Sequence, residues 1–322
     1  MQIETSARLH LSLIDLNGSI GRVDGSIGLT LEKPSLKLEC IENNTQTQVI
    51  TNGLDDEYEK KILSSYMKMC DYLDINTTYT FKINESYPIH HGLGLGTQLS
   101  LSTASLLANM NDVNLTSYEL ANIIGRGGTS GIGVYSFSEG GLIIDGGHKK
   151  TDKHSFLPSS ASNVSPPPLI ARYEIPDDWK IILITPDINA GVSGSNEVNI
   201  FQKYTPIKLD DVKTISYITL MKLMPAIVES DITSFGKAVN EIQNVGFKSI
   251  ERKLQPPIID TIINYMLDNG VAGAGMSSFG PTCFGITDTN TKILKHDILD
   301  LLDNNANVTV TKGKNHGAKI KI

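Results

Sequence analysis

The chain has 322 residues, of which 40% are hydrophobic, and 28 basic against 35 acidic side chains give it a formal net charge of −7. This composition is typical of a globular protein with one large domain or two smaller ones, and the acidic balance argues against a broad nucleic-acid-binding surface while allowing a local cationic pocket. The sequence shows no apolar signal segment and no apolar run of membrane-spanning length. Cys40, Cys70 and Cys283 match no disulfide or zinc spacing, so we expect a cytoplasmic protein with reduced thiols and no membrane or nucleic-acid partner.

The first part of the chain predicts strands at 3–13, 29–32, 36–41 and 79–83. Residues 15–28, between the first two strands, are punctuated by glycine and predict a flexible turn. The charged and imidazole side chains in or near this turn are Arg8, His10, Arg22 and Asp24. Two interpretations stay open for them: they are ordinary solvated residues, or they converge to clasp an anion.

Three helices are predicted in the same half of the chain, of which the one at 100–109 directly follows a glycine-rich loop. In 55–73 the apolar residues fall at helical spacing, which indicates a face buried in the core rather than a cofactor site. Thr116 and Glu119 are placed as the two ends of a capping box, which predicts a helix that begins there and ends at Gly125.

The segment 88–99 is the first candidate site. Gly92, Gly94 and Gly96 stand at every second position, which lets the backbone approach a ligand closely, and a helix is predicted directly after them at 100–109. A glycine-rich loop before a helix N-terminus is a common place to bind phosphate. The alternative is a glycine-rich turn that only joins a strand to a helix.

A second glycine-rich loop follows at 125–135 and precedes a buried strand predicted at 140–147. It carries Arg126, Thr129 and Ser130. A guanidinium can grip phosphate or carboxylate with two parallel hydrogen bonds, although a surface position would suit this arginine equally well. Two such loops in one domain favour a binding site.

Residues 151–178 are rich in serine and proline and include three consecutive prolines at 166–168, a composition that resists regular structure. We place the domain boundary here, with domains at 1–165 and 166–322. The segment is either an inert linker or a lid over the site.

The second domain predicts alternating strands and helices. A polar loop is expected at 190–198 and a third glycine-rich loop at 273–281. Strands are predicted at 179–185, 282–287, 308–311 and 318–322, and helices at 212–229, 231–245, 257–269 and 292–302. This pattern indicates a second α+β domain whose loops complete the first domain's pocket.

The three loops at 88–98, 125–134 and 273–281 resemble, in order and spacing, the three motifs of the GHMP kinase superfamily. The resemblance covers nearly the whole chain. It implies an α+β fold in which an N-terminal domain similar to domain 2 of ribosomal protein S5 is joined to a ferredoxin-like C-terminal domain.

Residues that such kinases use for phosphoryl transfer are missing here. The kinase loop has the pattern Pro-x-x-x-Gly-Leu-Gly-Ser-Ser-Ala, whereas Leu95 and Gly96 stand at its two serine positions in this chain. A leucine cannot coordinate Mg²⁺, although Thr97 or Ser100 could replace the lost ligand. Where kinases with an aspartate base have Ser-Gly-x-Asp, this chain has Gly133, which offers no base.

A non-kinase branch of the superfamily matches longer strings. The stretches at 7–18, 21–28, 91–98, 125–133 and 194–197 look like the archaeal β-ribofuranosylaminobenzene 5'-phosphate synthase family. The resemblance implies that phosphoribosyl pyrophosphate (PRPP) and 4-hydroxybenzoate or 4-aminobenzoate combine with loss of pyrophosphate and CO₂ in methanopterin biosynthesis, giving a C-riboside. It also implies Mg²⁺ as cofactor and a homodimer. The alternatives are an ATP-dependent small-molecule kinase and a nucleotide-binding sensor without catalysis.

The implied reaction needs stabilisation of the leaving pyrophosphate, a base near the electron donor of the ring, and groups that orient the substrates. The catalytic candidates are His10 or His91 as base, Arg22 to orient a carboxylate or sugar phosphate, and Asp24 to orient a histidine or the ribose hydroxyls. The substrate-binding candidates are Arg8, Gly92, Gly94, Gly96, Thr97, Gln98, Arg126, Gly128, Thr129, Ser130, Glu197, Gly275 and Ser277. Glu197 is also the candidate magnesium ligand.

Overall fold

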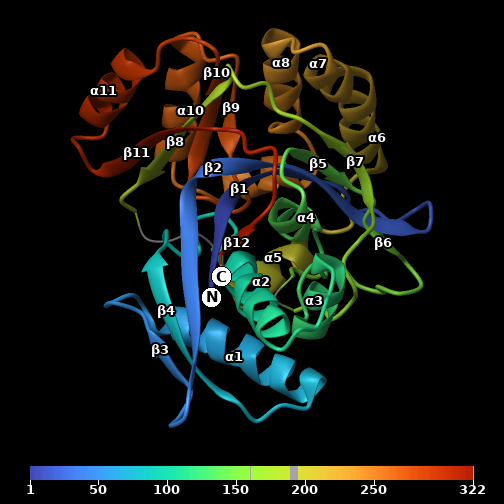
Figure 1. The fold of residues 1–322 in the computed structure, drawn as a ribbon. Helices are drawn as coiled ribbons and strands as arrows, with labels where there is room; N and C mark the ends of the chain where they lie inside the picture. The colour runs from blue at the N-terminus through green and yellow to red at the C-terminus, as the bar shows by residue number, and fades with distance from the viewer. Residues whose placement is uncertain (160, 189–194, 322) are drawn as a thin grey trace.

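The computed structural model describes residues 1–159, 161–188 and 195–321. These residues form one eight-stranded and one four-stranded sheet, with helices packed against both (Figure 1). The strands are β1 Gln2–Asp15, β2 Arg22–Asn43, β3 Gln48–Ile50, β4 Thr78–Glu85, β5 Leu142–Asp145, β6 His148–Lys149, β7 Leu169–Tyr173, β8 Lys180–Pro186, β9 Gly273–Met276, β10 Cys283–Thr287, β11 Ala306–Lys312 and β12 Lys319–Lys321. The helices are α1 Asp56–Leu73, α2 Leu95–Met110, α3 Ser117–Ile124, α4 Ile132–Ser138, α5 Ser195–Tyr204, α6 Leu209–Ile218, the π-helical turn η1 Thr219–Leu223, α7 Met224–Val228, α8 Ile232–Ile242, α9 Gly246–Lys253, α10 Ile258–Asp268 and α11 Lys292–Leu301.

The 22-residue strand β2 is the centre of the first sheet. It pairs antiparallel with β1, β4, β5 and β6, in a sheet whose main path is β12-β1-β2-β4-β3. The strands predicted at 29–32 and 36–41 are parts of this single strand. The expected flexible turn at 15–28 is also shorter than predicted, because the β1–β2 ladder continues to the pair Asp15 and Asp24.

The helices of the first half confirm the sequence signals that predicted them. The Asp55 side chain caps α1, and Tyr58, Ile62 and Met69 on its predicted apolar face are buried. The capping box and the end of α3 at Gly125 are also as predicted. α2 differs, because it begins at the end of the first glycine loop instead of at residue 100.

The second sheet, ordered β11-β8-β10-β9, is antiparallel throughout. Ile259, Ile262 and Met266 of α10 are buried in the same cluster as Ile182 and Ile184 of β8. Trp179, just before β8, packs on Phe235 of α8 with ring centroids 5.0 Å apart. These layers confirm the α+β alternation predicted for the second half.

The segment predicted as a third glycine-rich loop is partly a strand. β9 packs closely against α8, where a Cβ at Gly273 would lie 2.6 Å from the Cα of Gly236. A Cβ at Gly275 would lie 2.4 Å from the Gln243 side chain. The first glycines of this motif therefore serve packing between helix and sheet, and only 277–281 remains a turn.

Six further elements lie where the sequence predicted a loop, a linker or nothing. These are β3, β6, α4 in the second glycine loop, β7 in the proline-rich segment, α5 in the expected polar loop, and α9. All six are short, and short elements owe their stability to tertiary packing more than to local propensity. The preceding part of the expected polar loop, 190–194, lies outside the described residues.

The two halves of the chain are interleaved in the first sheet. β7 pairs with β5, and β12 pairs with β1, where Gln2 lies opposite Lys321. The two ends of the chain are consequently side by side (Figure 1). The domain boundary between residues 165 and 166 stays a prediction.

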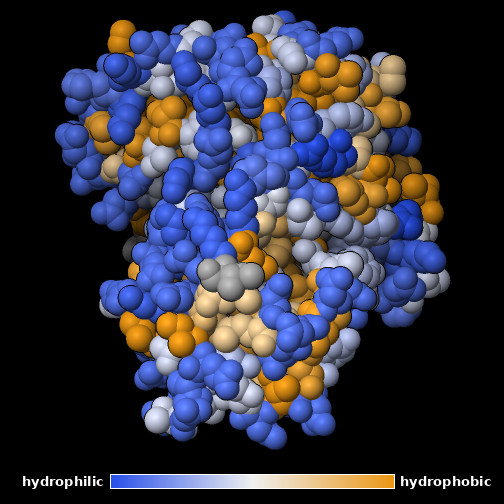
Figure 2. All heavy atoms as spheres, in the orientation of Figure 1, coloured by the Kyte–Doolittle hydropathy of each residue, from blue (hydrophilic) through white to orange (hydrophobic). Residues whose placement is uncertain are grey.

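The surface and the thiols agree with the composition. Hydrophilic side chains cover most of the face shown in Figure 2. No helix within the described ranges is long and apolar enough to cross a membrane. All three cysteines are free, as predicted, and Cys40 and Cys283 are buried.

Candidate functional site

A cavity of about 230 Å³ lies where both glycine loops meet β1 and the turn after β9. The first loop contributes Gly92, Gly94, Gly96 and Thr97. The second loop adds Arg126, Gly127, Thr129 and Ser130, and the second half of the chain adds residues from α5, α9 and 278–280. The cavity is thus shared by the two halves of the molecule, as the sequence predicted.

The first glycine loop delivers a helix N-terminus to this cavity. Gly94, with φ of 81°, is the residue before α2, and Leu95, Gly96 and Thr97 of the first helical turn line the cavity. The first N–H groups of a helix have no partners within the helix and carry a partial positive charge. The predicted geometry for holding an anion is therefore present.

Arginine side chains surround this helix N-terminus. Arg8 of β1 donates from Nη1 to the Gly92 carbonyl at 2.5 Å, and its side chain occupies the place that a Cβ at Gly94 would need. Burial, with Arg126 adding to it, lowers the pKa of Arg8 to about 10, so the group stays charged at neutral pH. Arg126 donates from Nη2 to Thr97 Oγ1 at 2.7 Å.

His10 lies beside these arginines as an uncharged group. Its backbone N–H donates to Ser277 Oγ at 3.0 Å, while its buried Nδ1 has no hydrogen-bond partner within the described residues. Burial lowers the pKa of His10 well below its usual value, and the positive charges of Arg8 and Lys248 lower it further. The imidazole is therefore neutral at neutral pH.

Two carboxylates face the cavity from the second half of the chain. Glu251 of α9 forms a buried ion pair with Lys248. Burial raises the pKa of Glu197, in the first turn of α5, to about 7, with Glu251 adding to the rise and Arg126 opposing it. A bound cation would stabilise the ionised form of Glu197 at this position.

The donor groups around the cavity fit Mg²⁺ only together with a bound substrate. The described residues hold no group of three or more His, Cys, Asp or Glu side chains that could bind a metal ion. Magnesium, however, is usually held by one or two carboxylates together with substrate phosphates and water. Glu197 fits that mode of binding.

An apolar wall closes the side of the cavity next to Glu197. Leu13, Phe201 and Phe279 line it and are at most 6% exposed. Phe247 packs behind them, with ring centroids 4.7 Å from Phe201 and 6.0 Å from Phe279. The cavity therefore combines a cationic, dipolar side with an aromatic side.

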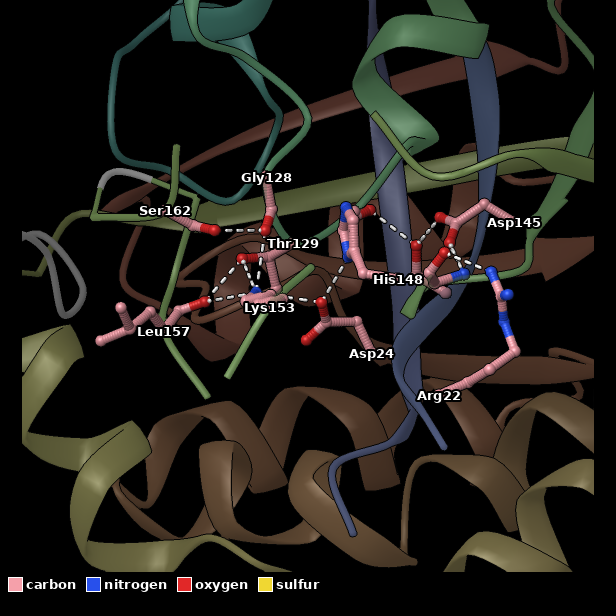
Figure 3. Close-up of polar contacts among 12 residues, drawn as sticks. Arg22, Asp24, Gly128, Thr129, Asp145, His148, Lys153, Leu157 and Ser162 are labelled. Atoms are coloured by element: carbon pink, nitrogen blue, oxygen red, sulfur yellow. Dashed lines mark hydrogen bonds and ion pairs between the residues drawn. The ribbon is translucent and has the colours of Figure 1, made fainter. Parts of the chain in front are cut away.

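Arg22 and Asp24, predicted at the site, lie outside the lining of this cavity. Arg22 donates to the carbonyls of Gly146 and Gly147, at 2.8 Å each. Asp24 is 1% exposed and accepts from His148 Nδ1 at 2.6 Å and from Lys153 Nζ at 2.9 Å (Figure 3). The β1–β2 ladder carries both residues away from Arg8 and His10, so the four groups do not converge.

Lys153 connects Asp24 to the second glycine loop. Besides Asp24, its Nζ donates to the Gly128 and Leu157 carbonyls and to Thr129 Oγ1, at 2.8 to 3.1 Å (Figure 3). The predicted residue Asp24 therefore stabilises the second glycine loop indirectly, by pairing with Lys153. No sequence signal indicated this lysine or His148.

The predicted site residues as a whole divide into those that line the cavity and those that do not. His10, Arg8, Gly92, Gly94, Gly96, Thr97, Arg126, Thr129, Ser130 and Glu197 line the cavity. Those outside its lining are Arg22, Asp24, His91, Gln98, Gly128, Gly275 and Ser277. Gln98 accepts from Thr5 and donates to the Gly133 carbonyl, and Ser277 donates to the Gly92 carbonyl at 2.7 Å. Both of these residues hold the loops in place.

Sequence reasoning missed several cavity residues. Lys61, Phe201, Glu251 and Phe279 line the cavity but belong to elements far apart in the chain. Each follows the ordinary pattern of a helix or a turn. Only the tertiary arrangement shows that they meet.

Comparisons with known proteins agree with this geometry. Residues 60–141 match the family described as GHMP kinases N terminal domain, and residues 223–295 match GHMP kinases C terminal. Among solved structures, a homoserine kinase from Cytophaga hutchinsonii is similar with a TM-score of 0.69 and 14% identity, covering 99% of this chain and 96% of that one. A mevalonate kinase from Methanococcus jannaschii is similar with a TM-score of 0.65 and 14% identity, covering 98% of both chains. At these identities the likeness concerns the fold alone.

Sequence relatives are much closer. A protein named beta-ribofuranosylphenol 5'-phosphate synthase from Methanothermobacter thermautotrophicus is 48% identical over 98% of this chain and 97% of its own length. A protein of the same name from Archaeoglobus fulgidus is 40% identical over the full length of both chains. The chain therefore has the GHMP kinase fold and belongs to the β-ribofuranosylphenol 5'-phosphate synthase family of enzymes.

Proposed function

We propose that this enzyme condenses PRPP with 4-hydroxybenzoate, releasing pyrophosphate and CO₂, to form β-ribofuranosylphenol 5'-phosphate for methanopterin biosynthesis. The observation that carries the proposal is the full-length identity to relatives whose name specifies this product. A phenol in the product favours 4-hydroxybenzoate over 4-aminobenzoate as the acceptor. The cavity supports the proposal because it offers both an anion-binding side and an aromatic side.

Departure of pyrophosphate leaves an electron-poor sugar carbon and a highly charged leaving group. The N-terminus of α2, with Arg8 and Arg126, would stabilise that charge. Lys61, at the edge of the same cavity, adds a third cation. These groups are held in place before substrate binds, since Arg8 is fixed on the Gly92 carbonyl and Arg126 on Thr97.

The aromatic acceptor would lie against Phe201 and Phe279, with its ring carbon facing the sugar. That carbon carries the carboxylate, and it forms the new bond while the electron-donating hydroxyl opposite stabilises the ring intermediate. His10, which lines the cavity, would offer the acceptor or the sugar an uncharged imidazole. Excluding water from this side limits simple hydrolysis of PRPP.

Glu197 would hold Mg²⁺ together with oxygens of the pyrophosphate, and Thr97 lines the same cavity with a hydroxyl. When bound, the ion neutralises charge on the leaving group. The expected homodimer stays a prediction, as does the cytoplasmic location.

The decisive measurement is release of labelled CO₂ from carboxyl-labelled 4-hydroxybenzoate and, separately, 4-aminobenzoate, with PRPP and Mg²⁺. Release that requires PRPP and is lost with EDTA supports the proposal. Folded protein that releases no CO₂ from either acid would overturn it. Replacing PRPP by ATP tests the kinase alternative, since ATP turnover with a small-molecule acceptor would favour it. ATP binding with neither reaction would favour a sensor.

A further inference from the structure

A buried carboxylate is connected to the cavity through two serine hydroxyls. Asp145, at the end of β5, is 1% exposed, and the Ser26 hydroxyl of β2 donates a hydrogen bond to its Oδ2. Ser26 Oγ in turn lies 2.7 Å from Ser130 Oγ, and Ser130 lines the cavity. The anion-binding side described above uses neither Asp145 nor Ser26.

Counting protons gives this chain of hydrogen bonds a direction. Ser26 has a single hydroxyl proton and gives it to the carboxylate, which can only accept while it is ionised. Ser130 must therefore be the donor in its contact with Ser26. Its oxygen also accepts from the Ile132 N–H at 3.3 Å, which leaves one lone pair for a donor in the cavity. A ligand hydroxyl is a donor of the required kind.

We propose that Asp145, acting through Ser26 and Ser130, accepts the hydroxyl proton of the aromatic substrate, an assignment that rests on the proposed function. The substrate hydroxyl gives its proton to Ser130, Ser130 gives its own to Ser26, and Ser26 gives its own to Asp145. The ring carbon that bears the carboxylate then bonds to the sugar carbon, and the pyrophosphate oxygen leaves with the electron pair of its bond. When CO₂ departs, its bonding pair returns to the ring, and the stored proton returns through the serines to the phenolate oxygen.

The surroundings of Asp145 suit a proton acceptor that works near neutral pH. Burial raises the pKa of Asp145 to about 6, while hydrogen bonds from Ser26 and from the Gly147 and Gly131 N–H groups oppose the rise. Asp24 raises it further from β2, and Tyr135 faces it from α4. Of the other groups labelled with Asp145 in Figure 3, Arg22 donates to the carbonyls of the next two residues, Gly146 and Gly147, and His148 pairs with Asp24.

His10 is a poorer acceptor in the same cavity. The charges of Arg8 and Lys248 oppose a positive imidazolium, so a proton taken up by His10 would be held weakly. Asp145 has no such opposition, because its protonation removes a buried charge. The sequence predicts a histidine as the base, whereas the structure offers a carboxylate that is better suited to this role.

The test compares Ser130→Ala, Ser26→Ala and Asp145→Asn with wild type in the CO₂-release assay, at saturating Mg²⁺ and from pH 5 to pH 9. Wild-type kcat should fall as pH decreases through about 6. Each variant should lose roughly 10²-fold in kcat, as expected for removal of general-base catalysis, with little change in KM for PRPP. The low-pH limb should be absent in the Asp145→Asn variant.

A more acidic substrate separates proton transfer from loss of structure. With 3,5-difluoro-4-hydroxybenzoate, whose hydroxyl ionises more readily, the ratio of wild-type to variant kcat should shrink towards one. Ser136→Ala is the matched control, because Ser136 Oγ on α4 is also buried and has no hydrogen-bond partner in the described part of the chain. It should keep wild-type kcat with both substrates.

The outcomes distinguish the two proposals. Wild-type CO₂ release with unchanged kcat in folded Ser130→Ala and Asp145→Asn variants would overturn the proton chain and leave the proposed function standing. An equal loss of kcat with both substrates would also overturn the proton chain. A loss that does not depend on the acidity of the substrate indicates a structural defect instead of a missing proton acceptor. Absence of CO₂ release by wild type would overturn both.

Discussion

Arg126 joins the two glycine loops at a single side chain. Its Nη2 donates to Thr97 Oγ1, while its buried Nε has no hydrogen-bond partner in the described ranges. A buried guanidinium nitrogen without a partner is costly. Arg126 also lines the cavity, where an anionic oxygen of the substrate would pair with its charge. Arg126 is therefore suited to bridging Thr97 and the ligand at once, which the ammonium of lysine cannot do with the same geometry.

Arg126→Lys should raise the KM for PRPP by about tenfold, which corresponds to roughly 1.4 kcal/mol of lost binding. The control is Arg172→Lys, because Arg172 donates to the Gly140 and Asn315 carbonyls and does not line the cavity. Steady-state kinetics with varied PRPP provide the measurement. An unchanged KM in Arg126→Lys would contradict a ligand role for this guanidinium.

Lys153 illustrates a residue that acts on stability instead. It is 4% exposed, and its Nζ neutralises Asp24 beneath the second glycine loop. Lys153→Met should lower the free energy of unfolding by about 3–5 kcal/mol, because one partner of a buried ion pair is left behind. Lys213→Met, in the exposed pair with Asp210, should cost less than about 1 kcal/mol. Urea unfolding measures both, and equal losses would refute the distinction.

At the scale of the element, the first glycine loop packs so closely against the turn at 277–281 that a side chain would not fit between them. Gly92 has φ of 79°, and a Cβ placed on it would lie 2.2 Å from the Ser277 carbonyl oxygen. Gly53 has φ of 87°, and a Cβ placed on it would have no atom within 4 Å. The pair therefore separates the cost of a left-handed backbone from the cost of a steric clash.

Gly53→Ala should cost about 1 kcal/mol of unfolding free energy, the ordinary penalty for a left-handed alanine. Gly92→Ala should cost clearly more and should also reduce kcat/KM, since the loop or the turn at 277–281 must move. Thermal unfolding and the CO₂-release assay give the two readouts. Equal destabilisation by both variants would show that the contact with Ser277 is unimportant.

What could be foreseen from the sequence follows from how local each signal is. The capping box at Thr116 and the glycines of the loops carry their conformational requirement in the residues themselves. By contrast, 29–32 and 36–41 look like two strands, and only pairing with β1 and β4 makes them one. Arg22 and Asp24 lie near Arg8 and His10 in sequence, but the β1–β2 ladder places the two pairs of residues far apart along the strands. Lys153 has no local signal at all.

At the scale of the whole molecule, two buried acids make the stability of the ligand-free protein depend on pH. The pKa of Asp145 is raised to about 6 and that of Glu197 to about 7. Both groups therefore bind protons more tightly in the folded chain than in the unfolded one, where ordinary values apply. Folding is favoured while they are protonated, and this contribution is lost as pH rises through 6 and 7.

The free energy of unfolding of wild type, minus that of the Asp145→Asn/Glu197→Gln double variant, should accordingly fall by about 5 kcal/mol between pH 4 and pH 8. His10, whose lowered pKa acts in the opposite direction, is present in both proteins and cancels in the difference. Urea unfolding at a series of pH values measures the quantity. A difference that stays constant, or rises, would contradict the assigned environments.

The Gly92 carbonyl has a consequence for how the two substrates influence each other. This one oxygen accepts from Arg8 Nη1 on β1 and from Ser277 Oγ in the turn after β9. The same turn leads directly to Phe279 on the aromatic side of the cavity. If a ligand on the anion side displaces this shared oxygen, the turn that carries Phe279 moves with it, and by reciprocity each ligand then alters the affinity for the other by the same factor.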